Sequence, residues 1–150
     1  MGHHISAIIG KAPINKEKAD EYDLPYFVEN SFVIVALEAS HIDFWDKKLG
    51  YGYEKMSKLF MDSKCTHFFA QEIGLSNFAI IFTDYFGGSG SQSATVYNSG
   101  KQILPPTENG VNKALRKIGV ERSLFKDEFD TIGLGKYRHW EGLFEKYEDL

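Results

Sequence analysis

Residues 80–97 read Ile80-Ile81-Phe82-Thr83-Asp84-Tyr85-Phe86-Gly87-Gly88-Ser89-Gly90-Ser91-Gln92-Ser93-Ala94-Thr95-Val96-Tyr97. Two β-prone runs flank a segment of glycine, serine and glutamine, and this pattern predicts two neighbouring strands joined by a hairpin. The connecting loop is expected to span 87–93. Because glycine accepts positive φ and lets backbone N–H groups come close to another molecule, this loop is also the first candidate for a functional segment.

The segments on either side of the hairpin predict further strands and helices. Strands are expected over 5–9, 32–37, 66–73, 78–86, 94–98 and 101–104. Helical patterns cover 16–22, 54–62, 111–118 and a short stretch near 126–132, and 41–49 fits a turn or short helix. No repeat or linker divides the chain. We therefore expect one α+β domain over residues 1–150, with an antiparallel meander around residues 66–104 packed against a few short helices.

Composition limits the classes of function. The chain has 150 residues, 43% of them hydrophobic and 15% aromatic, which is enough for one hydrophobic core. Its net charge of −4 argues against nucleic-acid binding, which needs clustered lysine and arginine, and favours a basic protein partner. With a single cysteine, no apolar run of membrane-spanning length and no signal-peptide pattern, we expect a cytoplasmic protein that does not bind membranes.

The glycine-rich loop has three interpretations. Successive backbone N–H groups can cradle a phosphate, but phosphate-binding loops lead into a helix and the nucleotide-binding version adds Lys-Ser/Thr, whereas here a β-prone run follows. The second interpretation is a connecting hairpin loop without chemistry. The third is a loop that contacts a partner protein or small ligand. The contact residues expected for this third case are Asp84, Tyr85, Phe86, Gly88 and Gln92.

Two other groups of residues could carry chemistry. Cys65 and His67 would share one face of the strand expected over 66–73, although a buried, unreactive cysteine is the commoner situation. The five histidines lack the His-x-x-x-His spacing of a helical zinc site, so no metal or other cofactor is expected.

The acidic run near the C-terminus is a further candidate surface. Asp127, Glu128 and Asp130 are expected either to form the solvated face of a helix or to dock a basic partner. No pair of carboxylates shows an environment that would set up acid–base catalysis, and we assign no catalytic residue.

These patterns favour a protein-binding domain over an enzyme. In size, acidic charge and composition the chain resembles the immunity proteins with which bacteria neutralise toxins; the resemblance covers no diagnostic motif and implies an antitoxin-type role. The alternative is a small-molecule-binding or catalytic domain in which the loop at 87–93 closes a pocket and Asp84, His67 or Cys65 carries the chemistry. Self-association through an unpaired strand at 94–98 or 101–104 is a further expectation.

Overall fold

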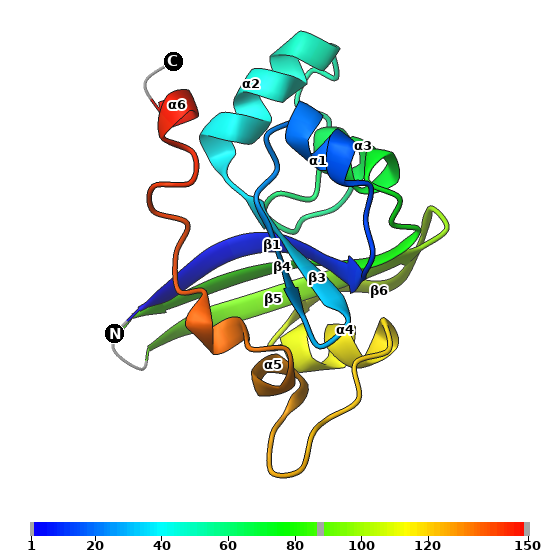
Figure 1. Ribbon diagram of the computed structural model, residues 1–150, viewed down its shortest axis with the longest axis vertical. Coiled ribbons are helices and arrows are strands. Elements are labelled where there is room, and N and C mark those ends of the chain that lie inside the picture. The colour runs from blue at the N-terminus through cyan, green and yellow to red at the C-terminus, as the bar shows by residue number, and fades with distance from the viewer. Residues whose placement is uncertain (1, 87–88, 149–150) are drawn as a thin grey trace.

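Six antiparallel strands form one open sheet in the computed structural model, which describes residues 2–86 and 89–148. Their order across the sheet is β2-β3-β1-β4-β5-β6 (Figure 1). The strands are β1 (His3–Lys11), β2 (Tyr26–Glu29), β3 (Phe32–Leu37), β4 (Asn77–Phe86), β5 (Ser89–Asn98) and β6 (Lys101–Glu108). The three consecutive strands β4, β5 and β6 make the meander, which starts at residue 77 rather than 66.

Helices cover both faces of this sheet (Figure 1). On one face lie α1 (Lys16–Glu21), α2 (Ala39–Leu49) and α3 (Lys64–Glu72). On the other lie α4 (Val111–Lys117), α5 (Glu128–Thr131) and the 3₁₀ turn η1 (Leu134–Lys136). The C-terminal segment then passes the edge of the sheet to reach α6 (Glu145–Glu148), which contacts α2. The protein is thus a single α+β domain, as the sequence predicts.

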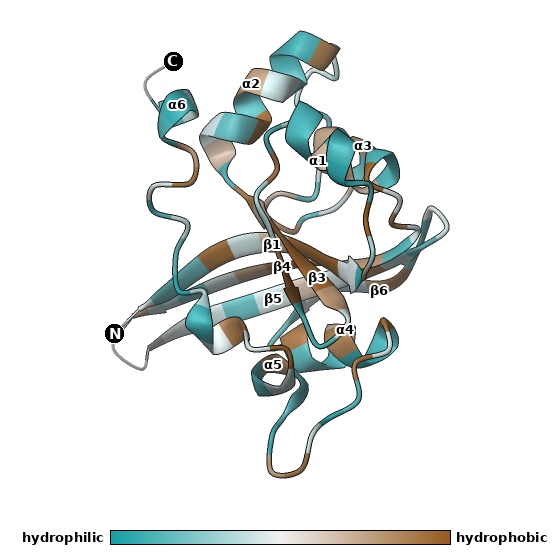
Figure 2. Ribbon diagram, viewed as in Figure 1, coloured by the Kyte–Doolittle hydropathy of each residue, from teal (hydrophilic) through white to brown (hydrophobic). Residues whose placement is uncertain are grey.

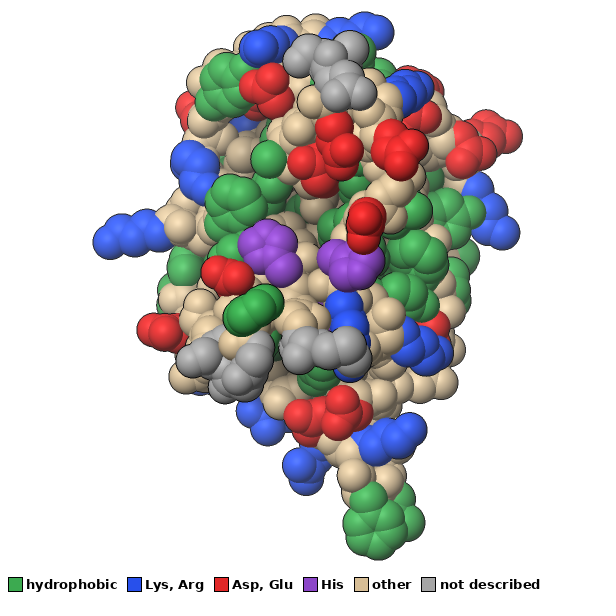
Figure 3. Space-filling model, turned by 90° about the vertical axis from the view of Figure 1, so that its left-hand side faces the viewer, with side chains coloured by type: hydrophobic (Ala, Val, Ile, Leu, Met, Phe, Trp, Pro, Cys, Tyr) green, Lys and Arg blue, Asp and Glu red, His purple; other side chains and the backbone are tan. Residues whose placement is uncertain are grey.

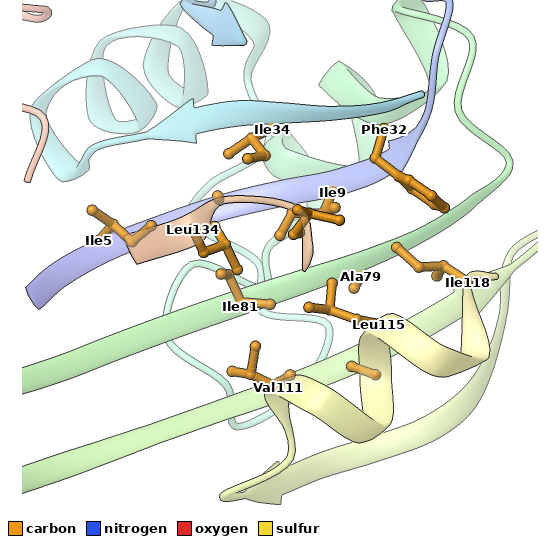
Figure 4. Close-up of a cluster of buried hydrophobic side chains, with 14 of the residues drawn as sticks. Ile5, Ile9, Phe32, Ile34, Ala79, Ile81, Val111, Leu115, Ile118 and Leu134 are labelled. Atoms are coloured by element: carbon orange, nitrogen blue, oxygen red, sulfur yellow. The ribbon is translucent and has the colours of Figure 1, made fainter. Parts of the chain in front are cut away.

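Because both faces are covered, the central strands carry buried apolar residues on both sides. The hydropathy colouring accordingly shows brown along much of β1 and β3 (Figure 2). Ile5, Ile9 and Ile81 point to the α4 side, where they pack with Leu115 and Leu134 (Figure 4). The alternate residues of the same strands form a second core with α1, α2 and α3; its members include Ile8, Val33, Val35, Ile80 and Phe69. The nearly continuous apolar run at 32–37, every residue of which is buried, follows from this double burial.

The prediction of a strand over 66–73 is wrong, because these residues lie mostly within helix α3. The Ser63 hydroxyl caps the helix by accepting a hydrogen bond from the N–H of Thr66. Cys65, Phe69 and Ala70 follow helical spacing and point into the second core. Cys65 and His67 therefore do not share a strand face.

The helix predicted over 54–62 is also absent: these residues form an irregular loop closed by an isolated bridge between Lys55 and Ser63. Tyr53 and Met61 adopt positive φ at its two ends, which interrupts any helix. Instead of showing a helical face, the loop turns the carboxylate of Asp62 into the interior.

The loop predicted over 87–93 is much shorter, because Ser89–Ser93 continue strand β5. Gly90 pairs with Tyr85 at φ +142°, and a Cβ added there would lie 2.0 Å from the carbonyl oxygen of Asp84. A glycine is therefore required within the strand itself. Gly88 lies outside the described residues.

The edge strands also differ in part from expectation. Residues 94–98 are paired on both sides, by β4 and by β6, so they offer no free edge. Strand β6 is an edge strand that continues through Pro105 and Pro106, which cannot donate ladder hydrogen bonds. Self-association through residues 101–104 stays a prediction.

Candidate functional site at the end of the hairpin

Strand alternation divides the residues predicted to contact a partner between the two faces of the sheet. Asp84 and Phe86 share the face of Phe82, on the side of α1, α2 and α3, whereas Tyr85 and Gln92 project toward α4 and α5. Viewed from this end of the molecule, histidine side chains lie among acidic and hydrophobic ones (Figure 3). The end of the hairpin therefore presents two different surfaces.

The first surface, which we call the aromatic patch, consists of His4, Phe60, Phe82, Asp84 and Phe86. The rings of Phe60 and Phe82 are 5.1 Å apart, and the His4 ring lies 5.6 Å from Phe82. Nδ1 of His4 lies 3.2 Å from Oδ1 of Asp84, a pair that is more than half exposed. Phe60 is 48% exposed and Phe86 82% exposed. This patch combines large exposed rings with a solvent-accessible carboxylate.

The second surface is a pocket of about 360 Å³ on the opposite face of the same strands. Residues far apart in the sequence form it; those used below are His3, Tyr85, Gln92, Asn112, Asp127, Phe129 and Arg138. Three of the residues predicted to contact a partner thus meet here, from the hairpin and from the start of α5. The pocket lies near the end of the hairpin, but Asp84, His67 and Cys65, to which the small-molecule hypothesis assigned the chemistry, do not line it.

His3 forms one wall of the pocket in a fixed neutral form. Its Nε2–H donates to the carbonyl oxygen of Leu134 at 2.9 Å, and the hydroxyl of Thr83 donates to Nδ1 at 2.7 Å. Burial lowers the pKa of His3, the hydrogen bond to Leu134 opposes this, and the positive charge of Arg138 lowers the pKa further. The ring packs 5.3 Å from Phe129, so the wall is aromatic rather than charged.

The polar acceptors of the pocket serve the fold. Oε1 of Gln92 accepts a hydrogen bond from the N–H of Val111 at 2.8 Å. This side chain of β5 therefore caps α4, because the residue that precedes the helix, Gly110, has no side chain that could do so. Asp127 caps α5, because its Oδ1 accepts a hydrogen bond from the N–H of Asp130. Its Oδ2 accepts a hydrogen bond from Nδ2–H of Asn112 at 3.0 Å. Sequence spacing alone predicts neither Asn112 nor Arg138 as part of this site.

The predicted acidic surface is only partly present. Glu128 is 2% exposed, with Oε2 3.9 Å from Nε of Arg116 and 3.8 Å from Nε of Arg122. The carboxylate of Asp127 caps α5, and Asp130 is the only one of the three residues that is exposed. A buried glutamate between two arginines belongs to the packing of α4 against α5, so these three residues do not form one docking surface.

Cys65 and His67, the other chemical candidates, lie away from this end. The Cys65 thiol is completely buried, and burial raises its pKa to about 12, which leaves it protonated and unreactive. Nε2–H of His67 donates to Oδ1 of buried Asp62 at 2.7 Å, and Tyr97 donates to Oδ2 at 2.7 Å. Ser57 donates to the same oxygen. This polar network fixes the loop at 54–62 to the sheet.

A groove of about 1000 Å³ lies between α2, the loop that follows it and α6, and Phe60 of the aromatic patch also lines it. Apolar side chains such as Ile42, Phe44 and Met61 line it together with three lysines. Each lysine has a contact in the protein: Lys47 pairs with Asp43, Lys48 lies over the ring of Trp45, and Nζ of Lys55 donates to the carbonyl oxygen of Leu59. None of the residues predicted to form a site lies in this groove.

Residues 2–86 and 89–148 contain neither a cluster of metal-ligating side chains nor a helix that could cross a membrane. This part of the chain holds no group of three or more His, Cys, Asp or Glu side chains placed to bind a metal ion. Its helices are all too short or too polar to cross a bilayer.

No protein-family model, curated protein or solved structure matches the chain.

Proposed function

We propose that this protein is a protein-binding domain that uses the aromatic patch to hold a partner. The observation that carries the proposal is the position of Phe86, 82% exposed and two residues from the exposed carboxylate of Asp84 on the same strand face. A large ring in water gains free energy when a partner covers it, and aromatic residues are often the anchors of interfaces.

The patch favours a partner that places a lysine or arginine next to an apolar side chain. A cationic group can pair with Asp84 and lie over the faces of Phe60 and Phe82, which attract cations. The net charge of −4 favours the approach of the same kind of partner. A neutralising role of immunity type is the finer form of this proposal, and its support is the general resemblance in size, acidity and composition.

The test is co-purification of the tagged full chain from a lysate of its natural source, with bound proteins identified by mass spectrometry. Wild type is compared with Phe86→Ser and Asp84→Asn, which change the patch at exposed positions. The matched control is Phe125→Ser, because Phe125 is 96% exposed in a separate loop between α4 and α5.

We expect a stoichiometric partner that the wild type and Phe125→Ser retain and that Phe86→Ser loses. Because a central aromatic anchor contributes about 2 kcal/mol or more, its loss should weaken binding roughly 30-fold. A partner lost only by Phe125→Ser would move the interface to the other loop. If no protein is retained at low or moderate salt, the proposal fails.

A further inference from the structure

The pocket at the end of the hairpin has more free hydrogen-bond donors than free acceptors. Its acceptor atoms are engaged: Oε1 of Gln92, Oδ1 of Asn112 and both carboxylate oxygens of Asp127 each accept a hydrogen bond. The uncommitted groups are donors. In the described chain, the guanidinium of Arg138, the hydroxyl of Tyr85 and Nε2 of Gln92 have no hydrogen-bond or ion-pair partner.

The body of the pocket is aromatic. The rings of His3 and Phe129 lie 5.3 Å apart at 55° to each other, and the hydrogen bonds from Thr83 and to Leu134 hold the His3 ring in place. Burial, and to a smaller extent the charge of Arg138, lowers the pKa of His3, which favours the neutral ring. A flat apolar group can therefore contact these rings while its polar end meets the donors.

From this arrangement we infer that the pocket binds a small aromatic carboxylate. An arginine binds a carboxylate through two parallel hydrogen bonds, and Tyr85 and Gln92, which line the same pocket, can each supply a further donor. The volume of about 360 Å³ admits a single-ring molecule and lies at the small end of ligand pockets. The inference is independent of the protein-binding proposal, because it uses the opposite face of the strands.

The test is a titration of the ¹⁵N-labelled full chain followed by NMR, with benzoate, inorganic phosphate and benzylamine as separate probes. Benzoate should produce saturable shifts at His3, Tyr85 and Phe129, with a dissociation constant of roughly millimolar size for so small a ligand. Benzylamine has the same ring with the opposite charge. It tests whether the carboxylate of Asp127, although engaged, sets the preference of the pocket instead.

Three variants each change one of the free donors. Arg138→Gln changes an exposed side chain, Tyr85→Phe removes only a hydroxyl, and Gln92→Glu keeps the oxygen that caps α4 while replacing the free donor with a charge. Arg138→Gln should weaken benzoate binding at least about tenfold. Lys117→Gln, an equal loss of charge at the far end of α4, should leave it unchanged.

Three results would overturn the inference. The first is the absence of saturable shifts at the pocket with benzoate, or shifts confined to the groove between α2 and α6. The second is stronger binding of benzylamine or phosphate than of benzoate. The third is unchanged benzoate affinity in Arg138→Gln, with the dispersed spectrum that shows the variant to be folded.

Discussion

Replacing the buried aspartate of the polar network should destabilise the protein strongly. Asp62 is 0% exposed and accepts hydrogen bonds from His67, Tyr97 and Ser57. In Asp62→Asn the amide nitrogen faces at least one of these donors, and the remaining bonds lose the charge of the acceptor. Hydrogen bonds to a charged group contribute about 1.5–3 kcal/mol each, so the free energy of unfolding should fall by about 3 kcal/mol. That is a large part of the 5–15 kcal/mol typical of a domain.

The same variant predicts a pH dependence. Burial raises the pKa of Asp62, but its three hydrogen bonds outweigh this and leave the pKa below its ordinary value of 3.8. A carboxyl with a lowered folded-state pKa stabilises the protein above its unfolded-state pKa, and this stabilisation is lost as the pH falls through the folded-state value. The difference between wild type and Asp62→Asn should therefore be complete at pH 7 and should shrink below about pH 4.

Urea unfolding followed by tryptophan fluorescence measures both effects, because Trp140 is buried in the folded protein. The matched control is Glu54→Gln in the same loop, whose carboxylate pairs with Lys64 at the surface and should contribute little. A loss below about 1 kcal/mol in Asp62→Asn, or a difference as large at pH 3.5 as at pH 7, would refute the reasoning.

Further variants test other parts of the fold. Burial lowers the pKa of His41, so the free energy of unfolding of the wild type should decrease as the pH falls below 6.5. Urea unfolding at pH 7.5 and pH 5.5 should show a smaller decrease for His41→Phe than for the wild type. The Cys65 thiol should not react with a thiol reagent at pH 8 until urea unfolds the chain; rapid reaction of the native protein would contradict its burial. Gly90→Ala should lower the free energy of unfolding by about 2 kcal/mol or more, because its Cβ would meet the Asp84 carbonyl, and an unchanged melting temperature would exclude that contact.

The sequence predicts the elements whose patterns are local. The apolar run at 32–37 and the helical spacing of Val111, Leu115 and Ile118 each indicate one structure, and the structure confirms both. The pattern of α3 is ambiguous, since alternating and helical spacing both fit the short apolar segment around Phe69. There the decisive signal is Ser63, the N-cap that precedes the helix.

The site depends on contacts that local patterns do not contain. Alternation along a strand predicts that the side chains of Asp84 and Phe86 point to the opposite face from Tyr85. Gln92 pairs with Thr83 on the neighbouring strand, so its side chain lies on the same face as Tyr85. That His3 and Arg138 reach the same pocket follows only from the tertiary fold, since 135 residues separate them in the sequence. Composition likewise cannot distinguish the exposed Asp84 from the buried Glu128.

The most direct test of the protein-binding proposal is calorimetric titration of the purified partner against wild type and Phe86→Ser. The account predicts binding to the wild type that weakens as salt is raised, because Asp84 pairs with a cation, and binding to Phe86→Ser that is roughly 30-fold weaker. Equal affinities for the two proteins, with no dependence on salt, would contradict the assignment of the aromatic patch as the binding surface.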